Sequence, residues 1–415
     1  MKFILPTICL LLLSTPSGVP ECNLLTNTNT YWPSAAIDKP DYLSPITDPV
    51  FGTKVTRITG DPGDPIPNLP DRVWPDEQLR HGYSKIQPWN CDMSMIFLDR
   101  TYPEVWLNGS TYEVLFTRHK PGSRVRWSNT EPETMFYIVS PDSGESVIGK
   151  WNVVTDEYHP VVSLTGYSEV TFGKGEGNFT NDGKQVAISA IRKSDNHEVI
   201  FIVDVEEGSK KADIDVYETA VEINNCTISP LGNYIVIAGD WGLGPDRLQV
   251  RDAVTGTVLY TETERGMPSH FDVQIDQNGD EVVAGVAKTT VYGVHSGTVI
   301  KRVLSNGNIS VICDHKYASH TSGRALNRQG WVFVTYQNRS ENYPPYLNEL
   351  VAVKLDGTRT ERINHLHSIK FNYVSESHGV PSPDGLRVLW ASNWDTDTYP
   401  VQAYVTDFRD TVIQK

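Results

Sequence analysis

The sequence has few cysteines, and none of them is arranged as in a metal-binding motif. Five cysteines occur among 415 residues, and no two have C-x-x-C spacing, so we do not expect a zinc site built on cysteine. Cys9 lies in the N-terminal apolar run. The other four leave room for one or two disulfides in an oxidising compartment, with the pairing open: Cys22, Cys91, Cys226 and Cys313.

Long basic runs are also absent, and the net charge is −15. Nucleic-acid binding needs clustered lysine and arginine, so this composition argues against a nucleic-acid partner. An acidic protein of this kind would bind an anionic sugar only through a local basic pocket.

Long hydrophobic runs are absent beyond the first residues. Lys2 precedes an apolar stretch from Ile4 to Leu13, which is too short to cross a bilayer and is followed by turn-prone residues. We therefore predict a signal peptide over residues 1–20 and a single secreted, extracellular domain over 21–415, without a membrane partner and as a monomer. N-glycosylation triplets support secretion weakly and occur at Asn108, Asn178, Asn225, Asn308 and Asn338.

Several catalytic motifs are missing as well. The chain has no G-x-S-x-G elbow, no H-E-x-x-H helix and no phosphate-binding G-x-x-x-x-G-K-[ST] loop. A Ser-His-Asp triad stays open, but nothing distinguishes one serine from the rest.

What the chain does have is an internal repeat. A polar turn, often with glycine or proline, is followed by a run rich in β-branched and aromatic residues. The copies begin at Cys91, Thr130, Asn181, Ser229, Asp276, Asn327 and Ser382. Their turns lie near positions 92, 132, 182, 230, 278, 328 and 384, so the intervals run from 40 to 56 residues. This period suits one four-stranded propeller blade.

Seven copies predict an all-β, single-domain, seven-bladed β-propeller. Phe51 to Thr59 and Gln402 to Phe408 are also β-rich, so strands from both ends of the chain would share one blade and close the ring. A β-helix or a pair of sandwiches is the structural alternative.

Charged residues and histidines recur upstream of these turns, on the strands expected nearest the axis. Three histidines lie 8, 8 and 6 residues before their turns, at His270, His320 and His378. Related positions in other blades carry His81, Arg126 and Glu176, and Asp272 and Glu376 lie close by. These residues could simply line a water-filled channel, but such a set is costly without a ligand.

The three histidines could also hold a divalent cation. Imidazole suits manganese or zinc, whereas Asp272 with backbone oxygens would suit calcium. We predict His270, His320, His378 and Asp272 as metal ligands, or alternatively as residues that bind substrate directly.

Longer stretches carry a family resemblance, which extends over roughly residues 45 to 410. The most specific part is the H-x-Y-S-x-x-Q-x-W-N stretch that begins at His81, together with the pre-turn histidines. The sequence resembles the propeller-fold polysaccharide lyases that cleave rhamnose–glucuronic acid linkages, namely ulvan lyases and fungal rhamnose–glucuronate lyases, and more distantly oligogalacturonate lyase. The resemblance implies β-elimination on an anionic plant or algal polysaccharide, giving a 4,5-unsaturated uronate.

Such a lyase needs a base, an acid and a group that offsets the charge of the uronate carboxylate. With the resemblance in view, we predict His81 as base or acid, Tyr167 as a second proton carrier and Arg126 as the charge neutraliser. Substrate-binding candidates are Arg124, Trp89, Trp127, Glu176, Asn178 and Arg324. The two tryptophans would stack on sugar, although most such tryptophans belong to a core.

Two other functions stay open at this stage. A non-catalytic propeller would bind glycans or proteins, and a glycoside hydrolase would use a carboxylate pair such as Glu176 and Asp272. The sequence does not distinguish ulvan from arabinogalactan side chains, nor endo from exo cleavage.

Overall fold

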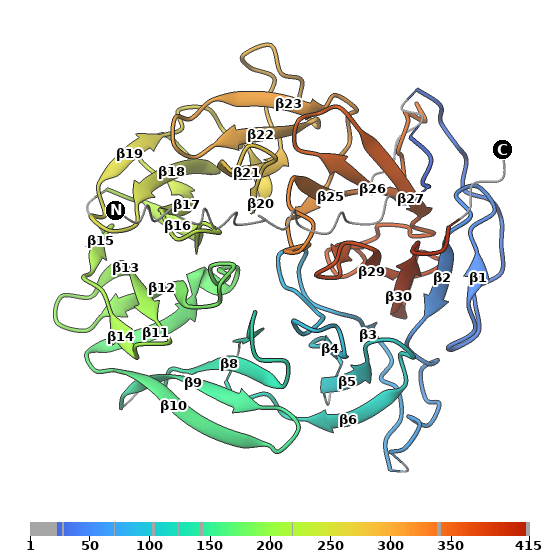
Figure 1. Ribbon diagram of the computed structural model, residues 1–415, viewed down its shortest axis with the longest axis horizontal. Helices are drawn as coiled ribbons and strands as arrows, with labels where there is room; N and C mark the ends of the chain where they lie inside the picture. Colours follow the sequence, from blue (N-terminus) through green and yellow to red (C-terminus); the bar gives the residue numbers. More distant parts are fainter. Residues whose placement is uncertain are drawn as a thin grey trace, which may run out of the picture.

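The computed structural model arranges seven β-sheets as blades around a central axis (Figure 1). It describes residues 23–411 except 27–28, 70, 102–103, 123, 142–143, 218 and 338–341. The predicted signal peptide and Cys22 lie outside the described residues. The seven-bladed propeller predicted from the repeat is confirmed.

The first three blades follow one another along the chain and pair their strands antiparallel. Blade 1 contains β4 (Met95–Leu98), β5 (Glu104–Asn108) and β6 (Val114–Arg118). Blade 2 contains β7 (Arg124–Trp127), β8 (Thr134–Val139), β9 (Ser146–Asn152) and β10 (Glu157–Leu164). Blade 3 contains β11 (Tyr167–Phe172), β12 (Gln185–Arg192), β13 (His197–Asp204), β14 (Ser209–Lys210) and β15 (Ile214–Asp215). A short 3-10 helix, η1 (Gly173–Gly175), follows β11.

The next three blades have four strands each. Blade 4 contains β16 (Glu222–Ile228), β17 (Tyr234–Asp240), β18 (Arg247–Asp252) and β19 (Val258–Thr261). Blade 5 contains β20 (Ser269–Ile275), β21 (Glu281–Val286), β22 (Val299–Val303) and β23 (Ile309–Cys313). Blade 6 contains β24 (His320–Ser322), β25 (Trp331–Tyr336), β26 (Glu349–Lys354) and β27 (Thr360–His365).

The seventh blade joins both ends of the chain, as predicted. β28 (Val380–Pro381), β29 (Arg387–Ser392) and β30 (Val401–Asp407) come from the C-terminal part, and β2 (Lys54–Arg57) pairs antiparallel with β30. β1 (Ile46–Thr47) adds to β2, and β3 (Gln78–Leu79) pairs parallel with β30. Because its backbone hydrogen bonds join segments from the two ends of the chain, this blade closes the ring.

The blades are less uniform than the predicted four strands each. Blade 1 has only three named strands, and its inner edge is extended by a single bridge between Trp89 and Ile96. The closing sheet has six strands and that of blade 3 has five. The repeat set the number of blades, whereas short extra strands at the edges depend on local pairing.

The core lies between neighbouring blades. One cluster combines Phe136 and Ile148 of blade 2 with Val186 and Phe201 of blade 3, all of them buried. A single blade leaves its two faces apolar, so stacking around the ring is what removes them from water.

The turn that marks each repeat uses specific chemistry. In the last copy, Gly385 has a φ of +65°, and a Cβ at this position would lie 2.7 Å from the Cδ atom of Arg328. Ser382 accepts a backbone hydrogen bond from Gly385 and donates its hydroxyl to Asp384. Glycine is therefore required both by the backbone conformation and by the close approach of the neighbouring blade.

Two further expectations concern disulfide bonds and membrane-spanning segments. Within the described part of the chain, Cys91, Cys226 and Cys313 are free thiols, so no pair among these three forms a disulfide. No described helix is long and apolar enough to span a membrane.

Candidate active site at the mouth of the propeller channel

The segment from Arg80 to Asn90, which we call the axial segment, links the closing blade to blade 1 and touches distant blades. Gln87 donates its amide to the carbonyls of Arg324 in blade 6 and Pro381 in the closing blade. Lys85 forms a 2.7 Å ion pair with Glu176, which follows β11 of blade 3. The predicted H-x-Y-S motif therefore lies where several blades meet.

Three histidines from three different blades gather beside this segment. The ring centroids of His270 and His320 are 4.7 Å apart, and those of His320 and His378 are 4.2 Å apart. Glu376 places its Oε2 atom 3.5 Å from the Nε2 atoms of both His320 and His378. We call His270, His320, His378 and Glu376 the histidine cluster.

The backbone at two of these histidines is in the left-handed region. His270 has a φ of +46° and His378 a φ of +45°. His270 lies at a register shift between Ser269 and Asp272 in the pairing of β20 with β21. A bulge of this kind redirects a side chain, and such conformations cost about 1–3 kcal/mol and concentrate at functional sites.

Hydrogen bonds define which ring nitrogens are free. The Nδ1 atom of His270 lies 2.5 Å from the Ser319 carbonyl, which can only accept, so Nδ1 carries the proton and Nε2 the lone pair. By the same reasoning, Nε2 of His81 donates to the His378 carbonyl at 2.7 Å. The Nδ1 atoms of His81, His320 and His378 are buried and have no hydrogen-bond partner in the part of the chain that the structure describes.

The surroundings keep these imidazoles neutral. Burial, followed by the charge of a nearby cation or imidazole, holds the pKa values of His81, His320 and His378 well below the ordinary value. Burial also lowers the pKa of His270, and the positive charge of Lys288 lowers it further. A neutral imidazole is the form that can accept a proton or ligate a metal.

Tyr83 adds a proton donor to the cluster. Its ring centroid lies 4.8 Å from that of His378 and 5.4 Å from that of His320. Burial and the nearby carboxylate of Glu176 raise the pKa of Tyr83 well above its ordinary value, so its hydroxyl is protonated at neutral pH.

Tyr83 and His270 line one cavity of about 250 Å³, together with Lys85, Glu176 and Tyr373. A second cavity of about 130 Å³ continues past Tyr83 and Tyr373 to Arg80, His81 and His378. Tyr83 and His270 are half-buried, so a bound sugar could reach both of these proton-carrying side chains.

Lys85, Lys288 and Lys370 lie close to the cluster, and Lys370 pairs with Glu376. The Lys85 ammonium also lies 4.2 Å from the centre of the Phe271 ring. A protein with a net charge of −15 thus concentrates cations around a neutral imidazole cluster. Each of these lysines also faces a carboxylate, Lys85 that of Glu176, Lys370 that of Glu376 and Lys288 that of Asp246, so their charges are partly neutralised.

Part of the cluster fits a divalent metal. The ligand atoms of His320, Glu376 and His378 all lie within 4.8 Å of one another. The Nε2 atoms of both histidines face the Glu376 carboxylate at 3.5 Å, and that carboxylate is only partly neutralised by Lys370, so an ion between them would have three ligands. Two imidazoles and one carboxylate favour manganese or zinc over calcium, which prefers an all-oxygen shell.

Asp272, predicted as a metal ligand, is engaged elsewhere. Its carboxylate forms two hydrogen bonds with the Arg324 guanidinium, at 2.8 and 2.9 Å, and accepts backbone N–H groups of Gly323 and Val273. Both side chains are buried. Neither Asp272 as a ligand nor Arg324 as a substrate-binding residue fits this geometry, because each already satisfies the other.

Arg126 is also engaged by the protein itself. It is buried, and its guanidinium donates to the backbone carbonyls of Gly175, Gly177 and Val125. Burial lowers the pKa of Arg126 to about 10. The prediction that Arg126 grips a substrate carboxylate does not fit, because its donors hold the turn after β11.

The remaining predicted residues lie outside the histidine cluster. Tyr167 donates its hydroxyl to Asp213 and packs on Phe201 within blade 3, so it does not act as a second proton carrier beside the cluster. Trp89 and Trp127 are buried in apolar clusters and cannot stack on a sugar.

Three further predicted residues come from blades 2 and 3. Asn178 is buried and donates its amide to the Lys85 carbonyl, which also removes it as a glycosylation site in the folded chain. Arg124 is half-buried beside Gly175. Of this group, only Glu176 lines the cavity next to His270.

Sequence reasoning missed Tyr83, Lys85 and the part played by Glu376. Tyr83 stands two residues after His81 inside the resembling motif, and Glu376 stands two residues before His378. Proximity to a predicted histidine was therefore the available signal.

No family model matches the sequence, and no curated protein matches it. Among solved structures, the fold is similar to an oligogalacturonate lyase from Vibrio parahaemolyticus, with a TM-score of 0.61 and 13% identity over 88% of this chain and 97% of that one. It is also similar to an oligogalacturonate lyase in complex with manganese, with a TM-score of 0.59 and 12% identity over 94% of this chain and 99% of that one. At such identities the likeness establishes the propeller fold.

Proposed function

We propose that the protein is a secreted polysaccharide lyase that cleaves rhamnose–glucuronic acid linkages by β-elimination. The observation that carries the proposal is the histidine cluster beside Tyr83, at the junction of two cavities and surrounded by cations. The similarity of the protein's fold to oligogalacturonate lyases, which by name act on uronates, adds support. Secretion rests on the basic and apolar N-terminal residues of the sequence.

The reaction sets clear requirements. A base removes the proton from C5 of the uronate, the C4–O bond breaks, and its electrons leave with the oxygen while a C4=C5 double bond forms. The departing oxygen takes a proton from an acid. Negative charge builds up on the carboxylate side of the sugar in the transition state and must be offset.

His270 is the side chain best suited to be the base. Its Nδ1–H is fixed on the Ser319 carbonyl, which leaves the Nε2 lone pair for the substrate. The residue is half-buried and lines the cavity beside Lys85.

Tyr83 is the matching acid, because its hydroxyl is protonated and lines the same cavity. The two groups come from different segments, His270 from β20 and Tyr83 from the axial segment. They can therefore approach a bound sugar from different directions.

The uronate carboxylate would lie among positive groups. Lys85 is held between Glu176 and the Phe271 ring and contributes a fixed charge. His320, Glu376 and His378 would hold a divalent cation such as manganese, whose charge stabilises the carboxylate when the ion is bound.

His81 acts through its neighbour rather than on the sugar. Its Nε2–H donates to the carbonyl of His378, a residue whose left-handed backbone must be held in place. Both ring nitrogens are buried, so we assign His81 as a positioning residue.

The hydrolase alternative has little support in this geometry. Asp272 is bound by Arg324 and Glu176 by Lys85, so the two carboxylates are not a free acid–base pair. A non-catalytic glycan-binding propeller is the outcome that the experiment must separate from a lyase.

The test is incubation of the purified protein with ulvan, with arabinogalactan carrying rhamnose–glucuronate side chains, and with oligogalacturonate. We expect the ultraviolet absorbance of an unsaturated uronate with at least one of the first two substrates, and its loss in Tyr83→Phe. Product from oligogalacturonate alone would overturn the linkage specificity. Cleavage without a double bond would indicate a hydrolase, and binding without cleavage a glycan-binding propeller.

A further inference from the structure

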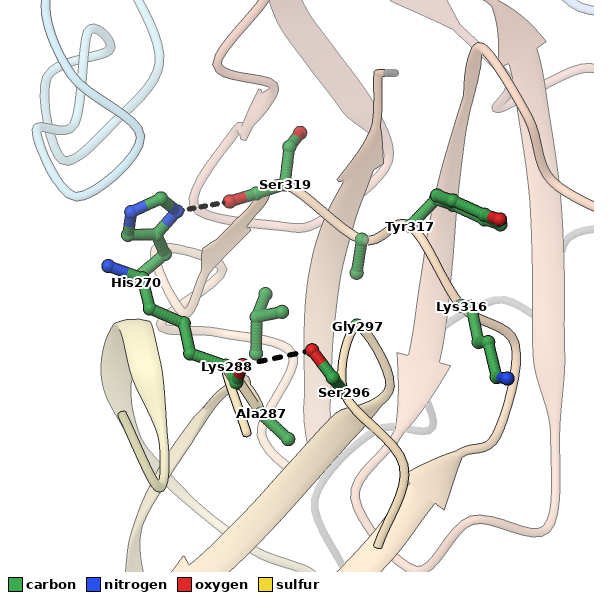
Figure 2. A pocket seen from close by; sticks show the side chains of 10 residues that line it. His270, Ala287, Lys288, Ser296, Gly297, Lys316, Tyr317 and Ser319 are labelled. Atoms are coloured by element: carbon green, nitrogen blue, oxygen red, sulfur yellow. Dashed lines mark hydrogen bonds between the residues drawn. The ribbon is translucent and has the colours of Figure 1, made fainter. Parts of the chain in front are cut away.

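A third cavity, the largest of those described here, adjoins the histidine cluster and has no part in the reaction above. It measures about 410 Å³ and lies between the segment after β21 and the segment from β23 to β24 (Figure 2). His270 lines both this cavity and the central one. Its volume is within the range of roughly 300–1,000 Å³ that is usual for small-molecule sites.

Two lysines line the cavity from opposite sides. Figure 2 shows the Lys288 side chain extending toward His270, whereas Lys316 projects from the other segment. The Lys288 ammonium lies 3.5 Å from Asp246, which leaves part of its charge for a ligand. Lys316 has no hydrogen-bond or ion-pair partner among the described residues.

The walls of the cavity are fixed by backbone hydrogen bonds. Gly297 donates to the Ala287 carbonyl at 2.7 Å and accepts from Ala318 at 3.1 Å, which ties the two segments together. The hydroxyl of Ser296 donates to the Lys288 carbonyl at 2.9 Å. Gly297 has a φ of +87°, and a Cβ there would lie 2.9 Å from the Tyr317 nitrogen. The cavity is therefore preformed.

We propose that this cavity is a subsite for a second anionic group of the same substrate chain, beside the sugar whose bond is broken. The inference rests on the proposed function and extends it: the substrate carries a carboxylate or a sulfate on a sugar near the cleaved uronate. The Lys316 ammonium at a preformed cavity, in a protein of net charge −15, gives such a group a favourable charge, to which Lys288 adds part of its own.

The test compares Lys316→Ala with Lys54→Ala, an exposed lysine on β2 of the closing blade that serves as the matched control. Both substitutions are made in the Tyr83→Phe background, so that binding is measured by titration calorimetry without turnover. The ligands are glucuronate oligosaccharides of one length: one with a single carboxylate, one with a second carboxylate, and one with a sulfate in place of the second carboxylate.

We expect Lys316→Ala to weaken binding of a doubly charged ligand by roughly two- to fivefold at low ionic strength, the size of one partly exposed ion pair. The loss should shrink at high salt because the charges are screened, and it should not occur with Lys54→Ala. Whichever doubly charged ligand shows the loss identifies the group as carboxylate or sulfate.

Equal losses for singly and doubly charged ligands, or equal losses in the two lysine variants, would overturn the subsite. A failure of the lyase proposal would give a different result. The wild-type protein would then give no unsaturated product, whereas the Lys316-dependent binding would persist. A second variant tests the shape of the cavity. Gly297→Ala should weaken binding of the same ligands, because its Cβ would force the two segments apart.

Discussion

The inner strands of this propeller carry polar residues at equivalent positions, yet two regions treat them differently. Around Arg126, Asp272 and Arg324 every charged group has several partners inside the protein. Around His270, His320 and His378 the backbone is in the left-handed region at two positions, and ring nitrogens remain without partners. The first region is internally paired, whereas the second is the one that the proposed function assigns to a ligand.

The two regions differ in how many of their buried polar atoms have hydrogen-bond partners, and not in residue type. A buried polar group without a partner costs roughly 1–3 kcal/mol, so a native fold keeps several of them together only where something else compensates. Arginine is the usual residue for binding carboxylates, but Arg126 and Arg324 both bind groups of the protein itself. The histidine cluster is distinguished by the combination of unpartnered ring nitrogens, left-handed backbone and adjoining cavities.

Substituting the proposed base tests the functional region most strongly. His270→Ala should lower turnover by about 10²–10⁴-fold, the usual contribution of a general base. Its unfolding midpoint should stay close to that of the wild type, because the residue is half-buried. His197→Ala, on outer strand β13 where His197 pairs with Asp215, is the control and should retain activity. Near-normal turnover of a folded His270→Ala protein would remove His270 from the mechanism.

The internally paired region should respond in the opposite way. Arg324→Ala leaves the Asp272 carboxylate buried without its partner and should destabilise the protein by about 3–5 kcal/mol in chemical denaturation. The exposed pair of Lys184 and Glu206 offers the comparison, and Lys184→Ala should leave the stability nearly unchanged because water and salt screen this pair. A stable Arg324→Ala protein that has lost only activity would support the original prediction that Arg324 binds substrate.

His81 lies at the border between the two regions. Because it is buried and its Nε2–H holds the His378 carbonyl, His81→Ala should lower stability by about 1–3 kcal/mol as well as turnover. His81→Gln keeps a donor and should recover part of the turnover. If His81→Gln folds but is as inactive as His81→Ala, His81 itself moves the proton.

The fold was predictable because its signal is repeated. Seven copies of a polar turn followed by a β-rich run determine the blade count, and the β-rich segments at both ends predict closure. Offsets from the turns also brought His270, His320 and His378 together, since equivalent positions on inner strands converge on the axis.

The same offsets selected Arg126 and Asp272, and here position was not enough. Arg126 is held by carbonyls of the turn around η1, and Asp272 by Arg324 from the neighbouring blade. Such partners depend on how irregular loops and adjacent blades pack, which no repeat pattern contains. Tyr83 was missed for a related reason, because its contact with two histidines exists only once the axial segment crosses the ring.

The smallest expected effect concerns a histidine that does have partners. His365 is buried at the end of β27, with Nδ1 3.4 Å from the Asp48 carboxylate and Nε2 bound to the Trp32 carbonyl. Burial alone would lower the pKa of His365, but the neighbouring Asp48 carboxylate outweighs it and raises the pKa above its ordinary value. Burial would likewise raise the pKa of Asp48, yet His365 and backbone N–H groups bring it below its ordinary value.

The signs of these two shifts define a pH window. A raised histidine pKa contributes stability that is fully present below the ordinary histidine value and is lost as the pH rises through the folded pKa. A lowered aspartate pKa contributes stability that is present above the ordinary aspartate value and is lost as the pH falls through the folded pKa. The pair should therefore stabilise the fold most between about pH 4 and 6.5, the ordinary values of the two groups. Denaturation midpoints measured from below to above that window should show a maximum in the wild type that flattens in His365→Gln, with turnover unaffected. An unchanged maximum would mean that other groups produce it, and a loss of turnover would place His365 with the functional histidines after all.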